Sequence, residues 1–265
     1  MIRALWWKEW REQRWRLALA ALVLVTISAG LVRAQLVTTD EATLLTFGPL
    51  GLLLTIFLAM GSVATERADG TWPFLMAQPL GRATVLRTKW AVGAVHLVAA
   101  FLLAGCAAHW AAWSRDLFRL QAVPIEYALQ MGVTAVPGGN SPGWLWSTTC
   151  LATISMLAWY TVLFFLLTRA RNELHAGLGG MLLTLAVLIW LAQYGMAQVP
   201  LGATGFSAGV WRLFWFTGIV CPLSPLASFV QPWFVKVIAC ALAAGLWIGA
   251  PLWLVGRLKS PRRWR

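Results

Sequence analysis

The chain has 265 residues, of which 60% are hydrophobic and 11% are charged, and its formal net charge is +12. Soluble globular proteins carry about 25% charged residues, so the composition excludes an ordinary soluble domain and indicates a membrane protein. The basic residues gather in the segments that flank the apolar stretches. Their distribution therefore indicates membrane orientation and does not indicate nucleic-acid binding.

Six segments are apolar and long enough to be predicted as transmembrane helices, because a crossing needs about 20 residues. These segments are residues 17–37, 43–65, 90–113, 144–168, 176–196 and 233–256. Alternate flanks carry the excess of Lys and Arg, which predicts that both termini lie in the cytosol. No small-x-small cleavage site precedes Arg33, so we expect the first span to stay uncleaved. The prediction is one all-α, multi-pass domain over residues 1–265 in the plasma membrane, the inner membrane of a bacterium.

Two further segments are predicted to lie along or within the membrane surface. In residues 1–16, Ile2, Trp6 and Trp10 recur at helical spacing, which favours an interfacial helix over an ordinary basic flank. Residues 197–232 are apolar but broken by Pro and Gly, and their longest apolar piece is half a span. We expect an external re-entrant or interfacial segment there, before the last span.

Catalytic motifs give little support to an enzyme. Ser207 stands in a Gly-x-Ser-x-Gly pattern, but no strand pattern precedes it and no His follows it, so a flexible turn is favoured over a nucleophile. No P-loop motif occurs in the chain. His96 and His109 fall within the third span on separate faces, where we expect neutral imidazoles capped by a neighbouring helix. We predict no catalytic residue, metal site or cofactor on this chain.

The four cysteines, Cys106, Cys150, Cys221 and Cys240, all fall in or near the predicted outer half of the membrane. No Cys-x-x-Cys motif occurs, and buried cysteines usually act as small apolar residues. A disulfide or a soft-metal role for these thiols stays open.

The longest polar interruption that also carries turn residues is the loop of residues 66–89, which the predicted topology places in the cytosol. Thr71 is expected to cap a short helix over residues 72–77, which ends at Pro79. Trp72 and its apolar neighbours would form a knob that fits a groove on a partner. The alternative is a helix that lies flat on the membrane.

Residues 64–82, ATERADGTWPFLMAQPLGR, resemble the first cytosolic loop of type-2 ABC exporter permeases. The shared pattern is Glu-Arg-x-x-Gly-Thr, a short apolar helix, a Pro and a basic residue. This chain departs from it at Trp72-Pro73, where the family usually has Leu-Glu. The residues that the resemblance implies in ATPase docking through this coupling helix are Glu66, Arg67, Asp69, Gly70, Thr71, Trp72, Phe74, Leu75, Pro79 and Arg82.

The resemblance implies a permease subunit of an ATP-driven exporter or flippase that works by alternating access. It would pair with a second permease copy or a homologous permease, and dock onto a separate ABC ATPase, in two copies, which binds ATP and Mg²⁺. Two alternatives remain. One is a non-transporting membrane scaffold or assembly factor, and the other is a permease that serves metal- or sulfur-related enzyme maturation.

Overall fold

The computed structural model describes residues 2–34, 42–43, 45–73, 81–114, 142–168, 173–190 and 233–257, and all its elements within these ranges are helices. In chain order they are α1 (Ile2–Ala34), η1 (Thr46–Leu50), α3 (Gly51–Ala68), α5 (Arg82–Ser114), α7 (Pro142–Leu167), α8 (Glu173–Trp190), α10 (Trp233–Ala243), η5 (Ala244–Gly249) and α11 (Ala250–Arg257). No strand occurs in the described ranges, as the sequence predicts.

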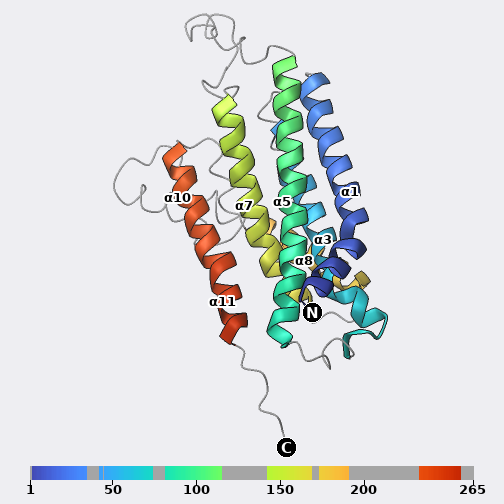
Figure 1. Cartoon of the computed structure of the whole chain (residues 1–265). Coiled ribbons are helices and arrows are strands. Elements are labelled where there is room, and N and C mark those ends of the chain that lie inside the picture. Colours follow the sequence, from blue (N-terminus) through green and yellow to red (C-terminus); the bar gives the residue numbers. More distant parts are fainter. Residues whose placement is uncertain are drawn as a thin grey trace, which may run out of the picture.

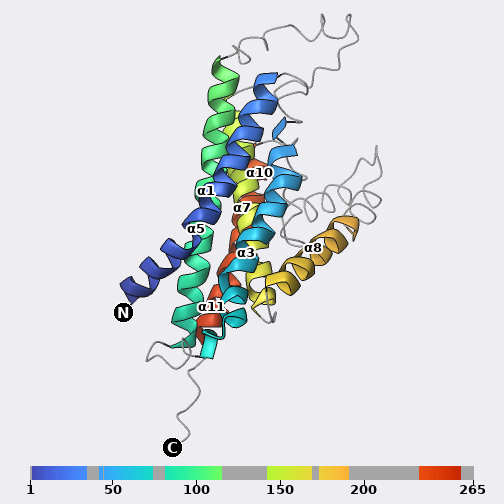
Figure 2. The ribbon, with the colours of Figure 1, turned by 90° about the vertical axis from the view of Figure 1, so that its right-hand side faces the viewer.

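The helices α1, α3, α5 and α7 pack side by side as a bundle, with α5 against both α1 and α7 (Figures 1 and 2). α10 and η5 pack against α7, and α8 contacts α3 and leans away from the bundle (Figure 2). At one end, the Arg87 guanidinium donates a hydrogen bond to the carbonyl oxygen of Leu252, 3.0 Å away, which joins α5 to α11.

Three of these helices are long and apolar enough to cross a bilayer: Arg3–Ala34, Ala83–Ser114 and Leu145–Leu167. Shorter apolar helices cover Thr46–Met60, Leu174–Ile189 and Cys240–Trp253. A helix satisfies its own backbone hydrogen bonds, and this makes it suitable for the hydrocarbon layer. The six crossings and their orientation stay predictions.

The core of the bundle is built from aromatic side chains packed against small residues. Phe47 and Phe101 stack with their ring centroids 5.5 Å apart. A side-chain carbon added at Gly93 would overlap the Tyr160 hydroxyl, and one added at Gly105 would lie 2.5 Å from the Thr149 methyl group. Glycine at these two positions of α5 therefore allows α7 to approach closely, as small residues do between membrane helices.

The helix boundaries differ from the prediction at two places near the polar loop. α1 is one continuous helix, where the sequence suggests an interfacial helix over 1–16 separate from a span over 17–37. Figure 2 shows its first turns at an angle to the rest. α5 begins at Arg82, eight residues before the predicted span at 90, because nothing in residues 82–89 breaks a helix. The predicted segment at 197–232 lies outside the described residues, as do Ser207 and Cys221.

Candidate functional site: a buried ion cluster where the polar loop begins

The predicted docking loop begins with a tightly closed helix end. α3 ends at Ala68, and Gly70 follows with φ of +70°, a left-handed conformation that favours glycine. The backbone N–H of Thr71 donates to the carbonyl oxygen of Glu66 at 2.9 Å, and the Thr71 hydroxyl donates to the same oxygen at 3.2 Å. This bond spans five residues, which is the Schellman arrangement of a helix C-terminus. Thr71 therefore closes the helix before it.

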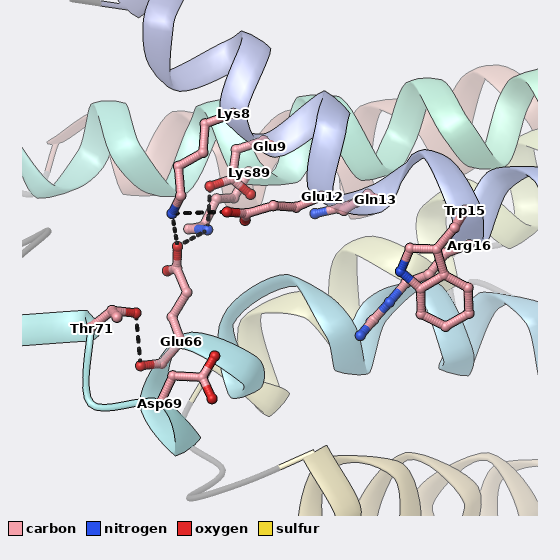
Figure 3. Close-up of a pocket in the computed structure, with 10 residues that line it drawn as sticks. All are labelled: Lys8, Glu9, Glu12, Gln13, Trp15, Arg16, Glu66, Asp69, Thr71 and Lys89. Atoms are coloured by element: carbon pink, nitrogen blue, oxygen red, sulfur yellow. Dashed lines mark hydrogen bonds and ion pairs between the residues drawn. The ribbon is translucent and has the colours of Figure 1, made fainter.

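The side chain of Glu66 turns inward and ties this helix end to two others. Its Oε1 atom lies 2.9 Å from Lys8 Nζ on α1 and 2.8 Å from Lys89 Nζ on α5 (Figure 3). Glu66 is only 6% exposed. The sequence suggests that this carboxylate is available to a partner, but in the structure it is occupied by cations of its own chain.

A second ion pair lies deeper in the same cluster. Lys89 Nζ donates to Glu9 Oε1 at 2.6 Å, and both side chains are 1% exposed. Lys89 thus bridges Glu9 of α1 and Glu66 of α3. Lys8 also lies 3.6 Å from Glu12, a pair that is largely exposed to solvent. The four inner groups, two ammonium and two carboxylate, balance in charge, which is the condition for burying ions at tolerable cost.

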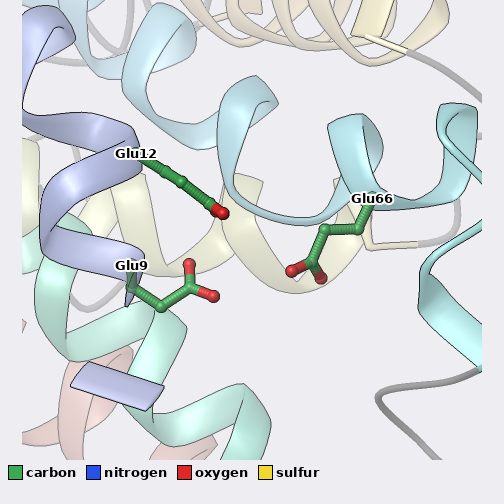
Figure 4. Close-up of side chains that lie close together, drawn as sticks. All are labelled: Glu9, Glu12 and Glu66. Carbon is green, nitrogen blue, oxygen red and sulfur yellow. The ribbon is translucent and has the colours of Figure 1, made fainter. Parts of the chain in front are cut away.

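A cavity of about 410 Å³ opens beside the ion cluster. Its walls come from α1, α3 and α5 and from the first residues of the polar loop (Figure 3). The lining residues are Lys8, Glu9, Glu12, Gln13, Trp15, Arg16, Glu66, Asp69, Thr71 and Lys89. Carboxylate oxygens of Glu9, Glu12 and Glu66 all lie within 4.8 Å of one another (Figure 4). The lining carries four acids and three bases, so its formal charge is −1.

Two histidines lie further along α5 from the ion cluster, His96 and His109. His96 is fully buried, and its ring lies 4.6 Å from that of Trp10 between centroids. Neither imidazole nitrogen has a hydrogen-bond partner among the described residues, so the expected cap from a neighbouring helix is wrong for His96. His109 packs against Trp113 and against Trp146 of α7.

The remaining predicted docking residues divide by exposure. Asp69 and Thr71 are exposed at the mouth of the cavity. Trp72 is half-buried and packs against the main core, so it does not form part of an outward apolar knob. Arg67 and Arg82 lie on helices α3 and α5. Phe74, Leu75 and Pro79 fall outside the described residues, as does most of the predicted 72–77 helix.

The cysteine prediction is resolved only in part. Cys106, Cys150 and Cys240 are free thiols, the first two exposed on the surface of the bundle. If these helices cross the membrane as predicted, lipid would cover the exposed thiols of Cys106 and Cys150.

Comparisons with known proteins support only the membrane character. A curated protein of Bacillus subtilis (strain 168), described as the uncharacterized transmembrane protein YxlG, is 41% identical to the chain over 54 residues. The match covers 20% of this chain and 21% of that protein, so the chain matches about a fifth of its relative's length. This match to a transmembrane protein and the three long apolar helices in the described ranges agree with each other. The chain is a membrane protein. No family model matches it.

Sequence reasoning missed Glu9 and Gln13 as members of the site. A signal was nonetheless present, because the buried face of α1 includes Ala20 and Leu24, and the same stripe extended backwards passes through Arg16, Gln13 and Glu9. Polar residues on an otherwise buried stripe indicate partners in the interior. Which partners they meet depended on how α3 and α5 pack.

Proposed function

We propose that the chain is the membrane subunit of an ATP-driven exporter or flippase of the type-2 ABC class, driven by a separate ATPase that docks at the polar loop. The loop sequence at residues 64–82 resembles the coupling loop of such permeases, and the chain has no P-loop of its own. Energy for transport would therefore come from another polypeptide.

The observation that best supports this proposal is that the Glu66 carboxylate pairs with two lysines on two other helices. Through Lys8 and Lys89, its carboxylate joins the start of the loop to α1 and α5, two of the three helices in the described ranges that are long enough to cross the membrane. Force applied by a partner at the loop would then reach both helices, through a buried ion pair to Lys89 and a part-buried ion pair to Lys8. The proposed topology, with six crossings and both termini in the cytosol, places this end of the bundle on the ATPase side.

In this proposal, docking and coupling use different residues. Asp69 is exposed and can meet a partner directly, whereas Glu66 faces the interior. We expect Asp69→Lys to weaken association with the ATPase. We expect Glu66→Gln to leave association largely intact but to reduce the stimulation of ATP hydrolysis, because a neutral amide no longer pairs with Lys8 and Lys89.

The test is to purify the full chain, identify a P-loop ATPase that co-purifies with it, reconstitute both in proteoliposomes, and measure association and vanadate-sensitive ATP hydrolysis. Glu12→Gln, which is exposed and outside the loop, serves as the matched control for the loss of a carboxylate. A chain that neither binds nor stimulates such an ATPase would instead support a non-transporting scaffold. If Asp69→Lys and Glu66→Gln both behaved as wild type in both assays, docking at this loop would be wrong.

A further inference from the structure

Two acceptor atoms in the wall of the cavity beside the ion cluster lack hydrogen-bond partners within the described ranges. Lys89 is engaged by Glu9 and Glu66, and Lys8 by Glu66 and Glu12. Two buried acceptor atoms that line the cavity, Oε2 of Glu66 and Oε1 of Gln13, have no partner within the described ranges. Glu66 is 6% exposed and Gln13 is 4% exposed, so an unmet acceptor at either residue is costly. An occupant that suits this cavity must bring donors.

The position of the cavity along α1 indicates where that occupant comes from. After Arg16, the next sixteen residues of α1, 17–32, carry no charge, and Arg33 lies at the far end of the helix. Trp15 is 54% exposed, and the Arg16 guanidinium lies 5.4 Å from its ring centroid and 5.5 Å from that of Phe57. Trp and Arg at the end of an apolar helix mark the headgroup layer. The cavity opens directly beside this pair (Figure 3).

The cavity lining carries both negative and positive side chains. The converging carboxylates of Glu9, Glu12 and Glu66 form one side (Figure 4). Arg16 supplies positive charge at the other end, whereas Lys8 lies against Glu66 and Glu12 (Figure 3). A ligand with a phosphate and an ammonium group matches this arrangement, with its phosphate at Arg16 and its ammonium at the acceptors.

We propose that this cavity binds the headgroup of a phospholipid that carries a primary amine, as in phosphatidylethanolamine. A primary ammonium has three N–H donors, enough for Glu66 Oε2, Gln13 Oε1 and Glu12. A choline headgroup has the same charge but no N–H, so it leaves these acceptors unmet. A bare metal ion fits poorly, because the ammonium groups of Lys8 and Lys89 already lie against the carboxylate oxygens it would need.

The experiment uses the purified full chain in detergent and titrates short-chain lipids while following the thermal unfolding midpoint. Four probes are compared: phosphatidylethanolamine, its N,N-dimethyl derivative, phosphatidylcholine and soluble O-phosphoethanolamine. We expect saturable stabilisation by phosphatidylethanolamine. The affinity should fall about tenfold for each lost N–H, because each removes one charged hydrogen bond, and so about a hundredfold for the dimethyl lipid and about a thousandfold for phosphatidylcholine. This comparison needs no variant.

Variants then place the effect at the cavity. Gln13→Leu removes an acceptor that takes part in no ion pair of the cluster and should lower the affinity for phosphatidylethanolamine about tenfold while leaving that for phosphatidylcholine unchanged. Arg16→Gln should weaken both lipids alike, and Arg14→Gln, an exposed residue two positions away and outside the cavity, should weaken neither.

Three outcomes would overturn the proposal. Equal affinities for the ethanolamine and choline lipids would show that no donor-dependent site exists, as would wild-type selectivity in Gln13→Leu. Soluble O-phosphoethanolamine binding as tightly as the lipid would assign the cavity to a soluble ligand. The proposal requires α1 to lie across the membrane but does not require an ATPase partner, so it stands or fails separately from the proposed function.

Discussion

Removing the ammonium of Lys89 tests whether the ion cluster holds the helices together. Lys89 and Glu9 are each 1% exposed and their charged atoms are 2.6 Å apart. In Lys89→Met, Glu9 loses the hydrogen bond it makes in the described structure, and its buried carboxyl group must either keep an unpaired charge or take up a proton. Leaving one member of a buried pair alone costs about 3–5 kcal/mol. The unfolding equilibrium constant should therefore rise about a thousandfold.

The double variant Glu9→Met/Lys89→Met separates loss of the pair from loss of packing. It removes both charges of the pair, and Glu66 keeps its 2.9 Å contact with Lys8. We expect the free energy of unfolding to return to within about 1 kcal/mol of the wild type, because replacing a buried ion pair by apolar residues of similar volume is often neutral. The two single changes should then be strongly non-additive.

The assay is equilibrium unfolding of the full chain in mixed micelles of increasing SDS fraction, followed by circular dichroism. Lys8→Met is the matched control, because its side chain is 40% exposed and such pairs contribute about 1 kcal/mol or less. A cost below about 1 kcal/mol for Lys89→Met, or simple additivity in the double variant, would refute the view that this cluster is a buried, coupled unit.

Three further predictions follow from single positions. Gly70→Ala should cost about 1–2 kcal/mol through its left-handed φ alone, whereas Gly30→Ala, in a helix with open space around it, should be neutral or stabilising in the same unfolding assay. Gly93→Ala should cost about 1–3 kcal/mol by overlap with the Tyr160 hydroxyl, and Tyr160→Phe in the same chain should recover part of that loss; no recovery would contradict the proposed contact. Asp69→Cys, in a chain without its native cysteines, should react with an impermeant maleimide in inside-out vesicles only, and reaction in right-side-out cells would reverse the predicted orientation.

Composition and hydrophobic patterning were enough to establish a helical membrane chain. Apolar runs of about 20 residues predict membrane-spanning helices, because a helix satisfies its own backbone hydrogen bonds inside the bilayer. The closed end of α3 was not predicted, because the predicted span ends at residue 65 and Thr71 is assigned to the next helix, whereas Thr71 bonds back to the carbonyl oxygen of Glu66. The predicted starts of α7 and α10 lie within two residues of the observed ones.

The site was decided by tertiary packing. Local sequence shows Glu66 as a polar residue in a loop motif, and nothing local reveals that its side chain turns inward to meet Lys8, 58 residues earlier, and Lys89, 23 residues later. Glu9 and Lys89 are likewise 80 residues apart. Such pairs form only when α1, α3 and α5 pack, so helices follow from near-neighbour patterns, whereas the partner of a buried charge depends on which helices come together.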